Sequence, residues 1–255
     1  MKAVAIAFNT YREAIRNKVL YSIFLFACLV TAISAAFGWA SIGDTIKFAR
    51  DFSLFSLSLF GVVTTVVLGV SLLSKELGKR TIYNILSKPV RRWQFLVGKF
   101  LGLIATLVVM MTLMTAALLM LLYSLEGRID WGILPVVAMM LLELAILSAA
   151  AIFFSSIVVT PALAGLFTAA TFVAGRSTPM LTYLMTPNQP ATLRYIARGL
   201  HAVLPHLHQF YIADRFAFDL TLSPGYYLYA AIYATAYSGL LLIVSVFIFQ
   251  RREFA

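Results

Sequence analysis

The chain has little charge and almost no cysteine. Charged residues make up 12% of its 255 residues, while apolar residues make up 62%, and this charge content is about half of what a soluble globular domain carries. The composition therefore excludes an ordinary soluble domain and indicates a protein of the lipid bilayer. Cys28 is the single cysteine, so no disulfide can form within one chain, and cysteine usage does not reveal the redox compartment.

Motifs of common enzymes are also missing. The sequence contains no Gly-x-x-x-x-Gly-Lys-Ser/Thr loop, no His-Glu-x-x-His pair and no Cys-x-x-Cys, which are the signatures of phosphate, zinc and redox sites. An intramembrane hydrolase or cytochrome needs histidine at membrane depth, but His201, His206 and His208 fall outside the long apolar runs. We therefore expect a non-catalytic membrane protein without an ATP site or cofactor of its own.

The net charge of +10 does not indicate a nucleic-acid partner. Nucleic-acid binding requires a basic face exposed to water, whereas the Lys and Arg residues here gather at the ends of apolar runs. An apolar run preceded by basic residues at the amino terminus resembles a secretory signal, but it is long for one and further runs follow. We expect it to be retained as a membrane span.

Apolar runs predict six membrane spans in one all-α domain. A span needs about 20 mostly apolar residues, and the runs cover residues 19–40, 52–73, 95–123, 132–157, 158–174 and 226–249. The fourth and fifth runs together make about 64 Å of helix, twice the thickness of the hydrocarbon layer. The turn between them is expected at Ser155–Pro161, because proline disfavours helix at the residue before it. The fifth span is short.

The distribution of basic residues predicts the orientation of these spans. With six spans, thirteen of the 20 Lys and Arg residues lie on the side that holds both termini, and seven lie on the other. Basic residues are enriched on the cytoplasmic side of membrane proteins. Both termini are therefore predicted to be cytoplasmic, and residues 175–225 form the extracytoplasmic segment. Parts of that segment are apolar enough to dip into the membrane interface.

Residues 1–18 have the pattern of an amphipathic helix. Met1, Val4, Phe8, Tyr11 and Ile15 recur at helical spacing, and polar residues occupy the rest of the helix surface. Such a helix can lie in the plane of the cytoplasmic interface, with its apolar side against the lipids.

Glu143 is the only carboxylate well inside a predicted span, in the run Met-Leu-Leu-Glu-Leu. A buried carboxylate must be paired, protonated or in contact with water, so a functional role is one hypothesis and a structural hydrogen bond to another helix is the other. The sequence offers no obvious basic partner. A proton-coupled secondary transporter that uses Glu143 is the alternative function that this residue suggests.

Two further patterns leave alternatives open. His201, His206 and His208 could bind a transition metal in a membrane assembly factor, although the lack of cysteine and carboxylate ligands favours ordinary interfacial histidines. Gly98-x-x-x-Gly102 permits two helices to approach closely, and it fits packing within the chain as well as a dimer contact.

A polar, basic segment at 75–92 separates the second and third apolar runs. Residues 75–86 predict a short amphipathic helix with Ile82, Ile85 and Leu86 on its apolar side. Pro89 ends this helix, and Arg92 with Trp93 marks the membrane interface where the next span begins. A purely solvated loop would not need the apolar side.

The residues of this segment resemble the pattern of type-2 ATP-binding-cassette (ABC) permeases, in which a Glu precedes an Arg-Thr-Ile run that ends in Gly-Lys. It is most similar to the small permeases grouped with multicopper-enzyme maturation, such as nitrous-oxide-reductase copper assembly. The amino-terminal Thr-Tyr-Arg-Glu stretch and the Phe-Ser-Ser stretch before Pro161 are similar as well. The matching positions of the segment and of the start of the next span are Glu76, Arg80, Thr81, Ile82, Leu86, Ser87, Pro89, Arg92, Gly98 and Lys99.

The resemblance implies a half-transporter in the inner (plasma) membrane of a bacterium. It would pair with a second permease copy or a similar permease, and with two cytoplasmic ABC ATPase subunits, which bind ATP and Mg²⁺. Some relatives also contact an extracytoplasmic protein. Residues 76–88 would be the coupling helix, and Ser155, Ser156 and Pro161 a second, smaller contact. The sequence departs from the commoner Glu-x-Gly-Thr pattern at Lys79-Arg80-Thr81. Nothing in it indicates the substrate. The ATPase contact would include Glu76, Arg80, Thr81, Ile82, Ile85, Leu86, Ser87, Pro89 and Arg92.

Overall fold

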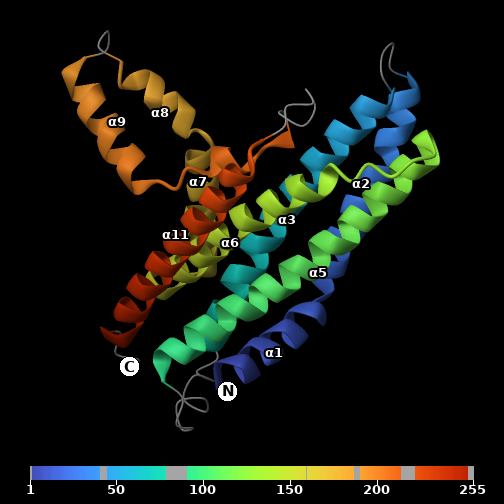
Figure 1. Ribbon diagram of the computed structural model, residues 1–255. Helices are drawn as coiled ribbons and strands as arrows, with labels where there is room; N and C mark the ends of the chain where they lie inside the picture. Colours follow the sequence, from blue (N-terminus) through green and yellow to red (C-terminus); the bar gives the residue numbers. More distant parts are fainter. Residues whose placement is uncertain are drawn as a thin grey trace.

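The structure is a computed structural model in which every regular element is a helix within the described part of the chain (Figure 1). It describes residues 2–40, 45–78, 91–158, 160–186, 190–213 and 222–251. The side chains of 35–40, 45 and 72–78 are outside the description. The apolar runs of the sequence all become helices, because uncharged residues gain most when the backbone satisfies its own hydrogen bonds. The elements are α1 (Lys2–Ile15), α2 (Lys18–Ala40), α3 (Thr45–Gly78), α5 (Arg92–Glu126), α6 (Ile133–Ile157), α7 (Pro161–Arg176), α8 (Thr178–Leu184), α9 (Ala191–Val203), the 3₁₀ helix η1 (Leu207–Phe210) and α11 (Pro224–Arg251).

Among the described residues, four helices are long and apolar enough to cross a membrane: α3 over Ile46–Ser71, α5, α6 and α11. A fifth span is reached if α1 and α2, which meet at an angle of 61°, count as one broken span. The chain is thus a multi-pass membrane protein. The fifth predicted span, residues 158–174, coincides with α7, which has only 16 residues, so six spans remain a prediction.

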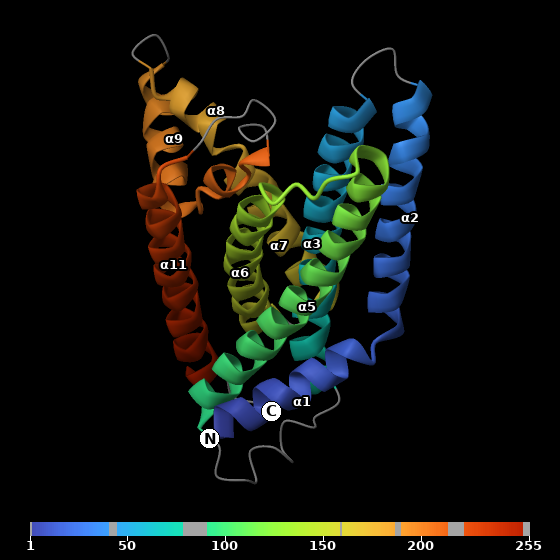
Figure 2. The same ribbon diagram turned by 45° about the vertical axis from the view of Figure 1, so that its right-hand side comes forward.

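The helices form a bundle with distinct ends. The amino-terminal helix α1 and the carboxyl-terminal end of α11 lie at one end, and α8 and α9 lie at the other (Figure 2). We call these the inner and outer ends, following the predicted topology. Helix α6 lies at the centre, where it packs against α3, α5, α7 and α11.

The break between α6 and α7 lies where the sequence predicts it. Helix α6 ends at Ile157, Val158 is extended, and Pro161 is the first residue of α7. Proline suits this position because the first helical N–H has no partner within the helix. The two helices then pack against each other.

Two glycines of α5, Gly98 and Gly102, lie where α1 packs against it. A Cβ at Gly98 would lie 2.9 Å from the Ala3 carbonyl oxygen, and one at Gly102 would lie 2.6 Å from that of Ala7. The absence of side chains therefore allows the two helices to approach closely. Of the two explanations left open by the sequence, the structure shows packing within the chain. The motif attaches the amphipathic helix to the bundle.

Candidate functional site

The most deeply buried charge of the described residues is Glu143 on α6. Its side chain is 1% exposed, and it lies about 15 Å along α6 from Ile133 at 1.5 Å per residue. Since the hydrocarbon layer is about 30 Å thick, Glu143 is at about mid-depth.

Arg176 is the partner of Glu143. Its Nε donates to Oε1 and its Nη2 donates to Oε2, both over 2.8 Å. Such a bidentate pair is the strongest common arrangement of Arg and carboxylate. The expectation that Glu143 has no obvious basic partner is therefore wrong. Its partner is Arg176, a residue of the predicted extracytoplasmic segment 175–225.

The length of α7 brings this partner to Glu143. The sixteen residues of α7 make about 24 Å of helix at 1.5 Å per residue, so a helix that begins at the inner end stops part-way across. Glu143 lies 14 residues before the end of α6 at Ile157, and Arg176 lies 15 residues after Pro161, so the two meet at similar depth. Counting from the proline turn in both directions could have revealed the pair in the sequence.

Groups from other elements complete the site around Arg176. Nη2 also donates to Ser58 Oγ of α3 over 2.7 Å. The ring centroids of Phe172 and Tyr211 lie 4.7 and 4.4 Å from its Cζ, within the range of cation–π attraction. We call Ser58, Glu143, Phe172, Arg176 and Tyr211 the central polar site. It links α3, α6, α7 and the chain after η1.

The central polar site is neutral overall, because one carboxylate and one guanidinium share it. Glu143 accepts both hydrogen bonds as an ionised group, and each charge offsets the desolvation of the other. The proton-carrier hypothesis for Glu143 stays a prediction. It requires uptake without an ATPase and loss of that uptake in Glu143→Gln, and strictly ATP-dependent transport would exclude it.

The three histidines lie together, His201 in the last turn of α9, His206 just before η1 and His208 within it. His206 Nε2 is 3.0 Å from His201 Nε2, and its Nδ1 is 3.1 Å from the Tyr233 hydroxyl. His208 Nδ1 is instead 2.7 Å from Thr178 Oγ1. Burial, followed by the charges that His201 and His208 can carry, lowers the pKa of His206. Within the described ranges, no group of three or more His, Cys, Asp or Glu residues is placed to hold a metal. The metal hypothesis remains to be tested by titration with copper and zinc.

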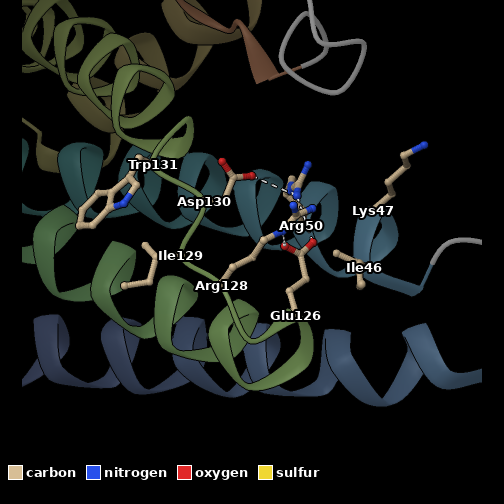
Figure 3. A pocket seen from close by; sticks show the side chains of 8 residues that line it. All are labelled: Ile46, Lys47, Arg50, Glu126, Arg128, Ile129, Asp130 and Trp131. Atoms are coloured by element: carbon tan, nitrogen blue, oxygen red, sulfur yellow. Dashed lines mark hydrogen bonds and ion pairs between the residues drawn. The ribbon is translucent and has the colours of Figure 1, made fainter.

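A second charged region lies where α3 begins and α5 ends. Arg50 Nη2 is 3.3 Å from Glu126 Oε1 and 3.0 Å from Asp130 Oδ2, as the dashed lines of Figure 3 show. Arg128 Nε is 3.3 Å from the other oxygen of Glu126 and is 82% exposed. We call Arg50, Glu126 and Asp130 the outer clasp. It borders a cavity of about 520 Å³ whose wall includes Lys47 and Trp131.

The coupling residues expected from the resemblance lie mostly outside the described residues. Arg80, Thr81, Ile82, Ile85, Leu86, Ser87 and Pro89 are all outside them, and Glu76 is described by its backbone alone. Arg92 is described, and its Nη1 donates to the carbonyl oxygens of Phe249 and Gln250 over 2.7 and 2.9 Å. A cation is favourable there because the last carbonyls of α11 carry partial negative charge. Arg92 thus ties α5 to α11.

The second predicted contact is partly buried. The side chains of Ser155 and Ser156 are buried in the bundle, and Ser156 Oγ donates to the Phe153 carbonyl oxygen over 2.7 Å. Pro161 is exposed beside them. Contact of this turn with an ATPase remains a prediction.

Comparison with known families gives one match that covers nearly the whole chain. The model of a family described as "ABC-2 family transporter protein" matches residues 4–253. It does not distinguish the copper-assembly group of permeases, which stays a prediction. No curated protein matches the chain.

Proposed function

Since the chain belongs to the ABC-2 transporter family, we propose that it is a permease subunit moved by ATP hydrolysis in a separate cytoplasmic ATPase. The family match carries this proposal. It takes in nearly all of the sequence, and the sequence has no phosphate-binding loop of the P-loop type. ATP and Mg²⁺ would therefore bind in the partner chain.

Contacts of α3 and α5 suggest how a movement would spread. Residues 75–92 join these two helices, so a displacement of the segment would shift the inner ends of both. From α5, the motion would pass to α11 through Arg92 and to α1 through Gly98 and Gly102. From α3, it would pass to α7 through the bond between Ser58 and Arg176.

The complete transporter would contain two permease copies and two ATPase subunits. Closure of the ATPase pair would tilt the spans and export a substrate from the cytoplasm or the inner leaflet. Transmission of force to an extracytoplasmic protein is the second possible output of the same movement. Transport by proteoliposomes that contain only the permease and its ATPase would distinguish the two.

Co-purification with the ATPase encoded beside the permease gene tests the proposal. We expect a stable complex whose ATP hydrolysis exceeds that of the free ATPase. The double substitution Ile82→Asp/Ile85→Asp should release the ATPase, because it places two charges on the apolar side of the expected coupling helix. Ile129→Asp is the matched control, since Ile129 is exposed at the outer end. Failure of the wild-type permease to retain the ATPase, or equal retention by all three forms, would contradict the proposal.

A further inference from the structure

The backbone beside Arg176 is irregular at mid-depth of the bundle. Helix α7 ends there, and the short helix η1 returns from the outer end to the same level, where a Cβ at Gly175 would lie 2.7 Å from the Pro205 carbonyl oxygen. Irregular backbone at membrane depth is tolerated where it is buried in protein or lines a water-filled cavity. Transporters often place their binding sites at such interrupted helices.

One nitrogen of the Arg176 guanidinium, Nη1, takes no part in the contacts with Glu143 and Ser58. Nε and Nη2 are engaged by Glu143 and Ser58, whereas Nη1 donates to no described atom and the side chain is 24% exposed. A guanidinium edge turned to hydrocarbon at mid-depth is costly, so intramembrane charges face a bundle interior, a water-filled cavity or another polar group. Nη1 of Arg176 therefore needs a polar group or water beside it.

We propose that Nη1 of Arg176 forms an anion-binding subsite on the transport path, which recognises a phosphate or carboxylate headgroup with an apolar chain. The N–H groups of this nitrogen can donate charge-assisted hydrogen bonds to the oxygens of such a group. The rings of Phe172 and Tyr211 beside Arg176 provide apolar contact. The inference rests on the proposed function, because it takes the space beside Arg176 to be the path of a transported molecule.

Glu143 sets the strength of this subsite. It lies behind Arg176 and neutralises the guanidinium, so an incoming anion meets a polarised pair rather than a full positive charge. A transport site must hold its ligand weakly enough to release it. Removal of the carboxylate charge should therefore tighten anion binding, whereas removal of both charges should abolish it.

Binding of dodecyl phosphate to the purified full-length permease in dodecyl maltoside micelles tests the inference. Glu143→Gln should bind this probe at least tenfold more tightly than the wild type, because the competing carboxylate charge is gone. Glu143→Gln/Arg176→Gln should lose at least tenfold relative to Glu143→Gln, and Glu143→Gln/Arg176→Lys should retain most of the binding. Dodecyltrimethylammonium, which carries the opposite charge, should show no such order.

Inorganic phosphate separates the two sources of the anion. Competition by inorganic phosphate at concentrations like those of dodecyl phosphate would assign the subsite to a free anion, whereas preference for the alkyl probe would assign it to an amphiphile headgroup. Equal affinity of Glu143→Gln and wild type for both anionic probes would overturn the inference. This single variant retains a side chain that can accept hydrogen bonds from Arg176.

Retention of the ATPase is measured on the same variants. If the wild-type permease does not bind the ATPase, the proposed function fails. If it binds the ATPase but the variants do not show the expected order of anion affinities, only this inference fails.

Discussion

The central polar site and the outer clasp use the same chemistry at different depths. In both, one arginine binds carboxylates from other elements, but both distances are 2.8 Å at Arg176 and they are 3.3 and 3.0 Å at Arg50. Glu143 is 1% exposed, whereas Glu126 and Asp130 are 7% and 22% exposed beside an open cavity. Glu143 is almost fully buried behind Arg176, whereas the carboxylates of the outer clasp border an open cavity, so loss of one partner should cost more at the centre.

The largest effect is expected when Arg176 alone is removed. Arg176→Met should reduce the free energy of unfolding by about 3–5 kcal/mol, because Glu143 is left as a buried charge without its partner. Glu143→Leu/Arg176→Met should restore most of this loss, since no buried charge remains. Unfolding followed by circular dichroism in detergent measures both. A single variant as stable as the double would show that Glu143 is not confined to a dry environment.

The contact between α1 and Gly102 of α5 involves no ion pair, so it gives a reference against which the two charged regions can be compared. Gly102→Ala should destabilise the attachment of α1 by about 1–3 kcal/mol, since the added methyl group would overlap Ala7 and Thr10. Gly239→Ala is the matched control in another membrane helix. A Cβ there meets nothing within 4 Å, so this change should be neutral or stabilise by up to about 1 kcal/mol. The midpoint of thermal unfolding should fall in Gly102→Ala and stay constant or rise in Gly239→Ala.

Breaking the outer clasp should have a smaller effect. Arg50→Met removes two partly buried charge-assisted contacts and should cost about 1.5 kcal/mol, with a smaller loss at high salt. Arg128→Met is the control, because an 82% exposed partner of Glu126 contributes at most about 0.5 kcal/mol. Denaturant unfolding at low and high salt gives both values. A loss at Arg50 as large as that at Arg176 would remove the distinction between the two regions.

A fall in pH should affect the outer end alone, and only slightly. The pKa of His206 is lowered in the fold, so the unfolded segment binds protons more readily than the folded one. The stabilisation is complete above the ordinary histidine pKa of about 6.5 and is lost as the pH falls through the lower folded value. The hydrogen-exchange protection of residues 191–210, corrected for the pH dependence of the intrinsic exchange rate, should fall between about pH 7 and pH 5, while the corrected protection around Glu143 should stay constant. His206→Gln should remove this pH dependence, and an unchanged response in that variant would assign it to other groups.

Much of the fold follows from local patterns of the sequence. Each predicted apolar run corresponds to a helix, the amphipathic pattern of residues 1–18 corresponds to α1, and the break before Pro161 lies where proline chemistry puts it. The resemblance to type-2 ABC permeases rests mainly on residues 76–99, and the match over residues 4–253 confirms it at the level of the ABC-2 family. These inferences succeed because apolar length, helical period and proline act on neighbouring residues.

The sequence alone indicated that Glu143 must be paired, protonated or in contact with water, but only the tertiary structure identified Arg176 as its partner. It also decided that Arg92 binds the end of α11, that Ser155 and Ser156 are buried, and that Gly98 and Gly102 receive α1 rather than a second chain. Each of these depends on which helix faces which, and on how far α7 extends. Apolar residues can be packed against several neighbours at similar free energy, so the composition of a span determines that it enters the membrane, whereas the packing of the bundle determines which polar groups meet inside it.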